Sequence, residues 1–106
     1  MLSKKQRTMK KILSIILIAL FLASCGKQPT ANFTWSPQNP VAGQEVQFTN
    51  TSIDSKSYDW NLGDMNISSE ENPKHTYTIP GNYIIDLLVH NGIKSDEKTV
   101  TITISN

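Results

Sequence analysis

The chain has 106 residues, a net charge of +1 and one cysteine, and its charge is unevenly distributed along the sequence. Residues 1–24 hold 5 of the 10 basic residues and none of the 9 acidic ones, so residues 25–106 have a net charge of −4. That acidic remainder is a poor candidate for nucleic-acid binding, which relies on basic surface to neutralise phosphates. Its length suits one domain with one modest core, and the single cysteine excludes an intramolecular disulfide.

The first 24 residues have the pattern of a secretory signal peptide. A basic head without acidic side chains precedes an apolar run from Ile12 to Ala23, which only Ser14 interrupts. This run is shorter than the roughly 20 apolar residues that a membrane-spanning helix needs. Met9 is followed by two lysines and would also make a compact start, so Met1 and Met9 both stand as possible first residues.

The leader ends in a motif that carries Cys25. Residues 22–26, Leu-Ala-Ser-Cys-Gly, resemble the lipobox of bacterial lipoproteins. The resemblance implies that the Cys25 thiol is diacylglycerated, with chains such as palmitate, and that the leader is cut so that Cys25 becomes the first residue. Two or more acyl chains anchor a protein stably to a membrane. Gly26 is not the aspartate that retains enteric lipoproteins in the inner membrane, so the resemblance favours the outer membrane. The alternative is an ordinary signal peptide with an incidental cysteine.

Residues 25–30 are predicted to be the lipidated cysteine and a short polar tether. At about 3.3–3.6 Å per extended residue, the tether reaches roughly 20 Å at most. The folded part would therefore lie close to the bilayer.

From Ala31 onward, apolar residues alternate with polar ones in short segments separated by turn-forming residues. The alternation covers residues 31–35, 44–50, 58–62, 75–77, 83–89 and 100–104. Period-two alternation predicts strands with one buried face, and no helical periodicity follows the leader. Six or seven short strands predict an all-β sandwich.

Ile84 and Leu88 fall on the nominal outer face of the strand over residues 83–89. They indicate either a central strand with both faces partly covered or an exposed apolar strip that meets a partner. The central-strand interpretation is the favoured one.

In chain order, these segments resemble a PKD (polycystic kidney disease) domain. Residues 58–64, Tyr-Asp-Trp-Asn-Leu-Gly-Asp, are similar to the family's W-D-F-G-D-G core, and residues 72–77 and 80–83 follow in the family order. The resemblance covers residues 31–106 and implies an immunoglobulin-like β-sandwich of about seven strands without a disulfide. It implies a structural motif of seven residues: Trp60, Gly63, Asp64, His75, Tyr77, Gly81 and Tyr83.

Two residues depart from the family pattern. Asn61 stands where the family has aspartate, and Met65 stands where it has the second glycine. Glycine adopts positive φ without steric cost and methionine does not. Asn66 is therefore expected to take the left-handed conformation instead.

Two tryptophans and a group of carboxylates are the remaining candidates for a site. Trp60 is predicted to be core, whereas Trp35 packs at a sheet edge or presents its ring to a sugar. Asp59 and Asp64 suggest calcium, but the spacing matches no recognised calcium loop. Asp64 is expected to bond backbone amides in its own turn, so we predict no metal site.

His75 and His90 stand alone in the sequence, and zinc needs three or four converging ligands. His75 is predicted to form a hydrogen bond near the Tyr77 turn, and His90 is predicted to face solvent. No nucleophile motif is present, so we predict no catalytic residues, no cofactor and no enzymatic activity.

The sequence favours a non-catalytic, lipid-anchored envelope module that binds protein or carbohydrate, as in adhesion. The alternative is a structural accessory lipoprotein docked on a larger membrane complex, with Trp35, Ile84 and Leu88 as its contact patch.

Overall fold

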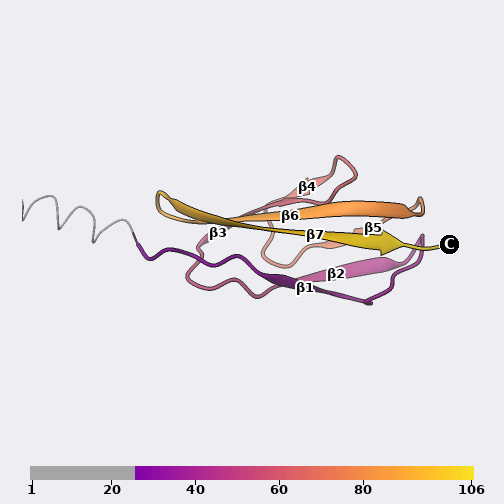
Figure 1. Cartoon of the computed structure of the whole chain (residues 1–106), viewed down its shortest axis with the longest axis horizontal. Coiled ribbons are helices and arrows are strands. Elements are labelled where there is room, and N and C mark those ends of the chain that lie inside the picture. Colours follow the sequence, from indigo (N-terminus) through magenta and orange to yellow (C-terminus); the bar gives the residue numbers. More distant parts are fainter. Residues whose placement is uncertain (1–25) are drawn as a thin grey trace, which may run out of the picture.

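A computed structural model describes residues 26–106, which form two antiparallel sheets packed face to face (Figure 1). The predicted leader and Cys25 lie outside the described residues. The three-stranded sheet has the order β1-β2-β5, and the four-stranded sheet has the order β4-β3-β6-β7. The strands are β1 (Phe33–Ser36), β2 (Glu45–Asn50), β3 (Ser57–Asn61), β4 (Ile67–Ser68), β5 (Lys74–Thr76), β6 (Gly81–Asn91) and β7 (Lys94–Ile104). The predicted all-β sandwich is confirmed, and in the described part of the chain there is no helix that could cross a membrane.

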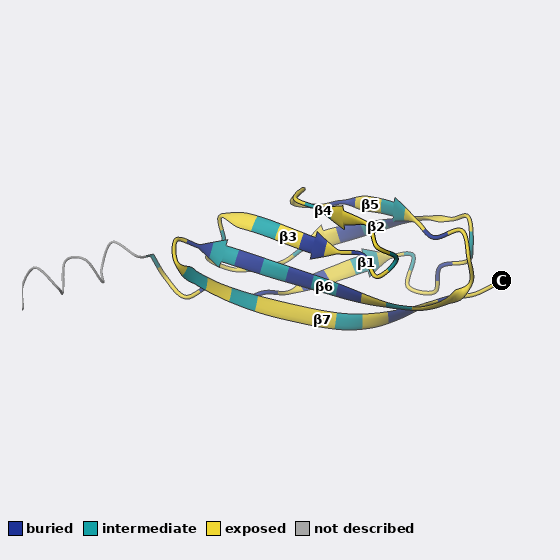
Figure 2. Cartoon of the chain, turned by 90° about the horizontal axis from the view of Figure 1, so that it is seen from above, coloured by how far each residue is buried: buried dark blue, intermediate teal, exposed yellow. Residues whose placement is uncertain are grey.

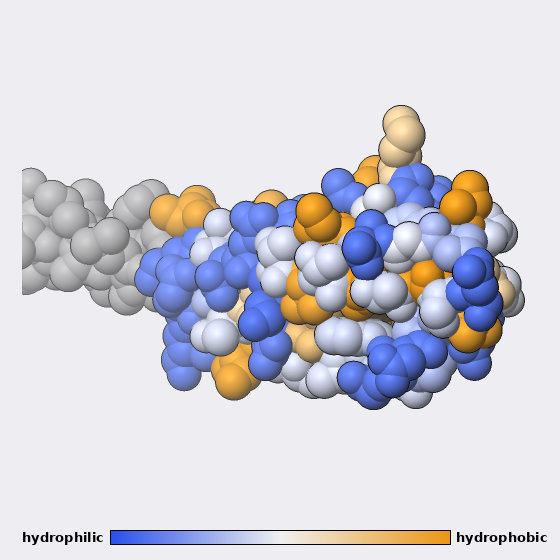
Figure 3. Space-filling model, turned by 45° about the vertical axis from the view of Figure 1, so that its right-hand side comes forward, coloured by the Kyte–Doolittle hydropathy of each residue, from blue (hydrophilic) through white to orange (hydrophobic). Residues whose placement is uncertain are grey.

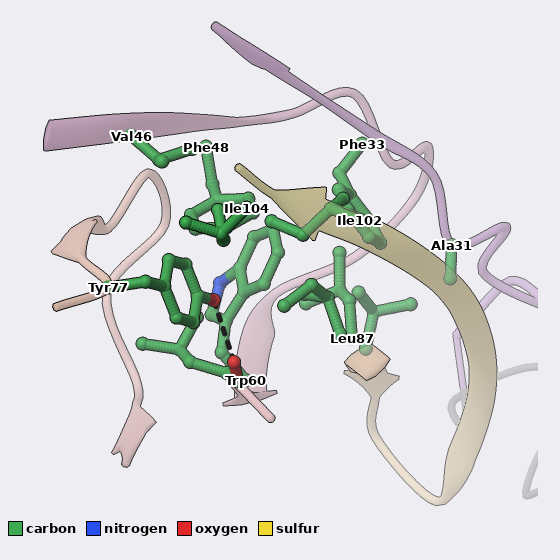
Figure 4. Close-up of a cluster of buried hydrophobic side chains, with 12 residues drawn as sticks. Ala31, Phe33, Val46, Phe48, Trp60, Tyr77, Leu87, Ile102 and Ile104 are labelled. Atoms are coloured by element: carbon green, nitrogen blue, oxygen red, sulfur yellow. Dashed lines mark hydrogen bonds between the residues drawn. The ribbon is translucent and has the colours of Figure 1, made fainter. Parts of the chain in front are cut away.

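The inward-facing residues of both sheets form one core. Trp60 on β3 is 1% exposed, and its ring centroid lies 5.0 Å from that of Phe33 and 5.6 Å from that of Phe48 (Figure 4). The other buried apolar residues are Ala31, Val46, Leu62, Tyr77, Ile85, Leu87, Val89, Ile102 and Ile104. All of them lie on the seven strands of residues 26–106 or on the segments that precede or connect these strands.

Strand β6 is central, paired with β3 on one side and β7 on the other. Its inward residues, Ile85, Leu87 and Val89, are fully buried, and the burial alternates along the strand (Figure 2). On its outer face Leu88 is half-buried, whereas Ile84 is 59% exposed. The central position agrees with the favoured interpretation, but the outer face is covered only in part.

Two strand features escaped the sequence pattern. Strand β4 has only two residues, too few to show alternation. Strand β7 starts at Lys94, six residues before the predicted segment, because the β6–β7 hairpin continues its pairing through a charged stretch. Residues 95–99 are mostly exposed at the sheet edge, so burial imposes little apolar periodicity there.

Residues 26–30 pack against the domain and do not form a free tether. Pro29 is buried, the Gln28 side chain donates a hydrogen bond to the Ser95 carbonyl at 2.8 Å, and the Asn91 amide donates one to the Lys27 carbonyl at 3.1 Å. Thr30 exchanges two backbone hydrogen bonds with Ile53, at 3.0 and 2.9 Å. Short polar segments look like linkers in sequence, and only these contacts reveal the docking.

The turn after β3 corrects the expectation for Asn66. Met65 itself adopts the left-handed conformation, with φ of 73°, and its side chain is 98% exposed. The Asn66 carbonyl accepts a hydrogen bond from the Leu62 amide at 2.9 Å. The turn therefore keeps the conformation that the family glycine would favour, at a steric cost borne by Met65.

Met65→Gly is expected to raise the free energy of unfolding by about 0.5–1 kcal/mol, because relief of left-handed strain exceeds the entropy that glycine adds to the unfolded chain. Urea denaturation measures the change. Met65→Ala retains the strain and should give no comparable gain, so equal gains in both variants would contradict this explanation.

Candidate functional site

An open groove of about 690 Å³ lies beside β4, between the outer side of β3 and β6 and the start of β5. Its apolar lining includes Ile67, Pro73 and Leu88. Polar side chains surround this lining: Asp59, Asn61, Asn66, Ser68, Ser69, Glu70, Lys74, His75 and Asp86. On the visible face of the domain, apolar surface occurs in separate small patches among polar side chains (Figure 3). The groove therefore offers mixed contacts and few large apolar ones.

Two hydrogen bonds from buried aromatic side chains fix the walls of the groove. The Trp60 indole donates to the Glu70 carbonyl at 2.9 Å and ties the β4–β5 connection to the core. The Tyr77 hydroxyl donates to the Leu62 carbonyl at 2.6 Å, the dashed line in Figure 4. Burial, together with the negative charge of Asp64, raises the pKa of Tyr77, so its hydroxyl remains a donor.

Asp64 joins the β3–β4 turn to β5. Its carboxylate contacts His75 Nε2 at 2.6 Å and accepts a hydrogen bond from the Asn66 backbone amide at 3.3 Å. The His75 ring packs edge-on against the Tyr77 ring, with 4.6 Å between the ring centroids. Burial raises the pKa of the Asp64 carboxyl, but the hydrogen bonds and the charge of His75 outweigh this and hold the pKa below its usual value. The predicted turn role of Asp64 and the hydrogen bond of His75 are both observed, and the sequence did not reveal that they meet.

The Asp64 pair predicts an acid-sensitive contribution to stability. Because the folded-state pKa lies below the ordinary value of 3.8, the contribution is complete above that pH and is lost as the pH falls through the folded-state value. Asp64→Asn keeps the turn acceptor and should lose about 1 kcal/mol or less near neutral pH, as partly exposed ion pairs do. Urea denaturation at a series of pH values measures the free energy of unfolding of wild type and variant, and the two values should converge in acid. His75→Gln should show the same convergence. A difference from wild type that is the same at every pH would contradict the assignment.

Asp59 and Asp64 are not brought together into a metal site. The Asp59 carboxylate contacts His90 Nε2 at 2.8 Å, whereas Asp64 contacts His75. Across residues 26–106, no group of three or more histidine, cysteine, aspartate or glutamate side chains could hold a metal ion. The His90 side chain, predicted to face solvent, is 33% exposed, and the sequence did not reveal its pairing with Asp59.

A shallower hollow on the same sheet face holds a close pair of carboxyl groups. It is lined by Ile84, Asp86, Glu97 and Thr99 among others. The hydrogen bond to Asp86 and the negative charge of Asp86 raise the pKa of Glu97. The Thr99 hydroxyl donates a hydrogen bond to Asp86 Oδ1 at 2.9 Å. This part of the outer face is therefore acidic.

Trp35, Ile84 and Leu88 do not share one surface. Trp35 is half-buried on the inner side of β1, its ring centroid 6.3 Å from that of Phe33, and its indole donates to the Gln38 carbonyl at 3.3 Å. Ile84 and Leu88 lie on the outer face of the other sheet. The predicted three-residue patch is wrong for Trp35, because β1 directs that side chain toward the core.

Several groove residues were not predicted as site residues, including Asn61, Lys74 and Asp86. The sequence could have indicated Asp86, since it is the only charged residue in the otherwise apolar run from Tyr83 to Val89. Asn61 was noted only as a departure from the family. Its Oδ1 accepts the Gly63 amide at 3.1 Å, which an aspartate would also do.

Comparisons with known proteins agree with this geometry. The chain is similar to the PKD1 domain of the Vibrio cholerae metalloprotease PrtV, with 32% identity, a TM-score of 0.66 and coverage of 76% of this chain and 100% of that one. It is similar to the PKD1 domain of Vibrio anguillarum Epp, with 28% identity, a TM-score of 0.66 and coverage of 76% and 96%. A structure of carbohydrate-binding modules from the beta-sandwich superfamily, described for promiscuous specificity, shows 31% identity and a TM-score of 0.72.

The match to the carbohydrate-binding structure covers 76% of this chain but only 35% of that one, so this chain spans about a third of its length. No curated protein matches the chain. The family model of the PKD domain matches residues 26–105, nearly all of the described part, and the PKD domain is a non-catalytic immunoglobulin-like module. This chain therefore belongs to the PKD domain family.

Proposed function

We propose that the protein is a non-catalytic binding module, anchored in a bacterial envelope membrane through acylated Cys25, that captures a protein or carbohydrate partner. The observation that carries the binding role is the open groove beside β4 on a PKD domain. The anchor rests on the lipobox resemblance of residues 22–26, and the same resemblance favours the outer membrane.

Similarity to carbohydrate-binding modules supports a carbohydrate partner. The groove would bind a sugar mainly by hydrogen bonds, with the carboxylates of Glu70 and Asp86 accepting from sugar hydroxyls and polar groups such as Asn61 beside them. A sugar ring has little exposed aromatic surface to stack on. Within residues 26–106 the exposed large apolar side chains are all aliphatic or methionine, and the ring of Trp60 is buried. A protein partner would use the same polar groups together with the aliphatic lining.

A second candidate is an accessory subunit docked on a larger membrane complex. The outer face of the four-stranded sheet favours it, because Ile67 and Ile84 are 81% and 59% exposed there and Leu88 is half-buried. These aliphatic side chains could form the apolar centre of a protein contact, with the surrounding carboxylates at its polar rim.

Cys25→Ser tests the anchor. The unchanged protein should fractionate with membranes and carry acyl chains by mass spectrometry, and the variant should move to the soluble fraction or retain its leader. Unmodified Cys25 in the native protein would refute anchoring but leave the binding role standing.

Groove variants test the binding role. Asp86→Ala and Lys74→Ala should weaken capture of a partner in cross-linked pull-down from the envelope or on a glycan array, because both side chains line the groove. Thr103→Ala lies outside the groove lining on β7 and serves as the control. A glycan captured through the groove supports carbohydrate binding and a protein supports the accessory role. Capture that is unaffected by both groove variants would contradict this site.

A further inference from the structure

Three segments far apart in sequence meet at the end of the sandwich where the described chain begins (Figure 1). They are residues 26–32, the β2–β3 loop (residues 51–56), and the β6–β7 turn with the first three residues of β7 (residues 92–96). The Asn91 side chain bonds the Lys27 carbonyl, Thr30 pairs with Ile53, and the Lys56 amide donates to the His90 carbonyl at 2.8 Å.

Two isoleucines are exposed at this end. Ile93 occupies the two-residue turn between β6 and β7 and is 81% exposed, and Ile53 in the β2–β3 loop is 62% exposed. Neither contributes to the core, so packing within the domain does not explain them. Apolar and hydrophilic surface lie side by side next to the start of the described chain (Figure 3).

Three of the five lysines in residues 26–106 belong to the same three segments: Lys27, Lys56 and Lys94. We call these lysines together with Ile53 and Ile93 the basic end. Its segments contain two acidic residues, Asp54 and Asp96, and Asp96 accepts a hydrogen bond from the Ala31 amide at 2.7 Å. The rest of the domain carries the other 7 acidic residues and only 2 lysines.

The three segments therefore have a net charge of +1, whereas the rest of the domain has a net charge of −5. An anionic bilayer surface attracts a nearby lysine by about 1 kcal/mol and repels carboxylates by the same electrostatics. Exposed isoleucines gain by entering the interfacial region. Both effects orient the same end toward the lipid.

We propose that the basic end docks on an anionic bilayer surface, with Ile53 and Ile93 in the interface and Lys27, Lys56 and Lys94 against lipid phosphates. The inference rests on the proposed anchoring, which delivers the domain to the membrane and places the bilayer next to the end where the chain enters. A bilayer is favoured over an acidic protein because the chain enters at this end, where Gly26 lies against Asn91. Docking holds the sandwich end-on and leaves the groove beside β4 accessible.

The test uses residues 25–106, which hold the seven strands and the buried cluster of the described chain, with Cys25 coupled to a maleimide lipid in nanodiscs that also hold a gadolinium-chelating lipid. One set of discs is phosphatidylcholine and the other contains phosphatidylglycerol. Relaxation enhancement of backbone amides reports contact with the bilayer. We expect several-fold larger enhancement at Ile53 and Ile93 on the phosphatidylglycerol discs, and little at Ile79, an equally exposed isoleucine in the β5–β6 loop at the opposite end.

Combined Lys27→Glu, Lys56→Glu and Lys94→Glu should reduce the enhancement to the phosphatidylcholine level, and Ile53→Ser with Ile93→Ser should reduce it in part. The control variant combines Lys74→Glu on β5 with Lys98→Glu on β7, both outside the basic end, and should leave the enhancement unchanged. Equal enhancement on both kinds of disc, or an equal effect of the control reversal, would overturn the proposal. Because the disc supplies the tether chemically, these outcomes are independent of whether the native Cys25 is acylated.

Discussion

Trp60→Ala should lower the free energy of unfolding by about 3–5 kcal/mol, the usual cost of removing a large aromatic side chain from a core. Trp60 on the four-stranded sheet is 1% exposed and its ring packs against those of Phe33 and Phe48 on the other sheet, so truncation leaves a cavity that both sheets border. The variant also loses the hydrogen bond to the Glu70 carbonyl, which holds the wall of the groove. Small domains have about 5–15 kcal/mol of stability in total, so the loss removes a large share of it.

Urea denaturation followed by far-ultraviolet circular dichroism measures this effect without relying on tryptophan fluorescence. If Trp60→Ala does not fold, Trp60→Phe should still fold and lose about 1–3 kcal/mol through reduced volume and the missing donor. Trp35→Ala is the matched control, because Trp35 is half-buried and should cost clearly less. Near-native stability of Trp60→Ala would refute its place at the centre of the core.

Gly63→Ala is expected to cost about 2–5 kcal/mol, the second large effect. A Cβ atom at Gly63 would lie 2.7 Å from the carbonyl oxygen of Ile84 and 3.0 Å from its nitrogen. These are backbone atoms of the central strand β6, so a neighbouring side chain cannot move aside to relieve the clash. Gly63 also has φ of 85°, which adds left-handed strain of about 1–2 kcal/mol for alanine.

Gly43→Ala separates the two causes. Gly43 has nearly the same φ, 86°, but no heavy atom lies within 4 Å of the position that an added Cβ would take, so only the strain remains. Urea denaturation of both variants should show Gly63→Ala losing more stability by about 1–3 kcal/mol. Equal losses would mean that the backbone of β6 shifts without a measurable cost. The close approach of the β3–β4 turn to the sheet would then contribute nothing to the free energy of unfolding.

Much of the fold could be predicted from the alternation of apolar and polar residues along the sequence. The pattern of Tyr83, Ile85, Leu87 and Val89 predicts a strand with one buried face, and the structure buries the last three fully. Such a pattern reports only burial within one strand. It could not predict β4, which is too short for a period, or the charged first half of β7, where exposure at the edge removes the constraint.

The candidate site was less predictable, because its parts come from separate strands. Asp64 and His75 are 11 residues apart, and nothing in either local sequence says that the β3–β4 turn faces β5. Met65 shows a different limit. Its residue type disfavours positive φ, yet the turn imposes that conformation because Gly63 and Leu62 are already held by contacts with β6 and Tyr77.

Local sequence was sufficient to predict the strand pattern, the apolar core, the family resemblance and the division of charge between basic residues 1–24 and an acidic remainder, since each depends on composition or period. It could not predict which loops share an end of the sandwich. Strand directions bring Lys27, Lys56 and Lys94 together beside two exposed isoleucines, although in sequence these lysines are isolated and predict no basic surface. Charge clustering depends on distances through space, and the antiparallel pairing of the folded chain sets those distances.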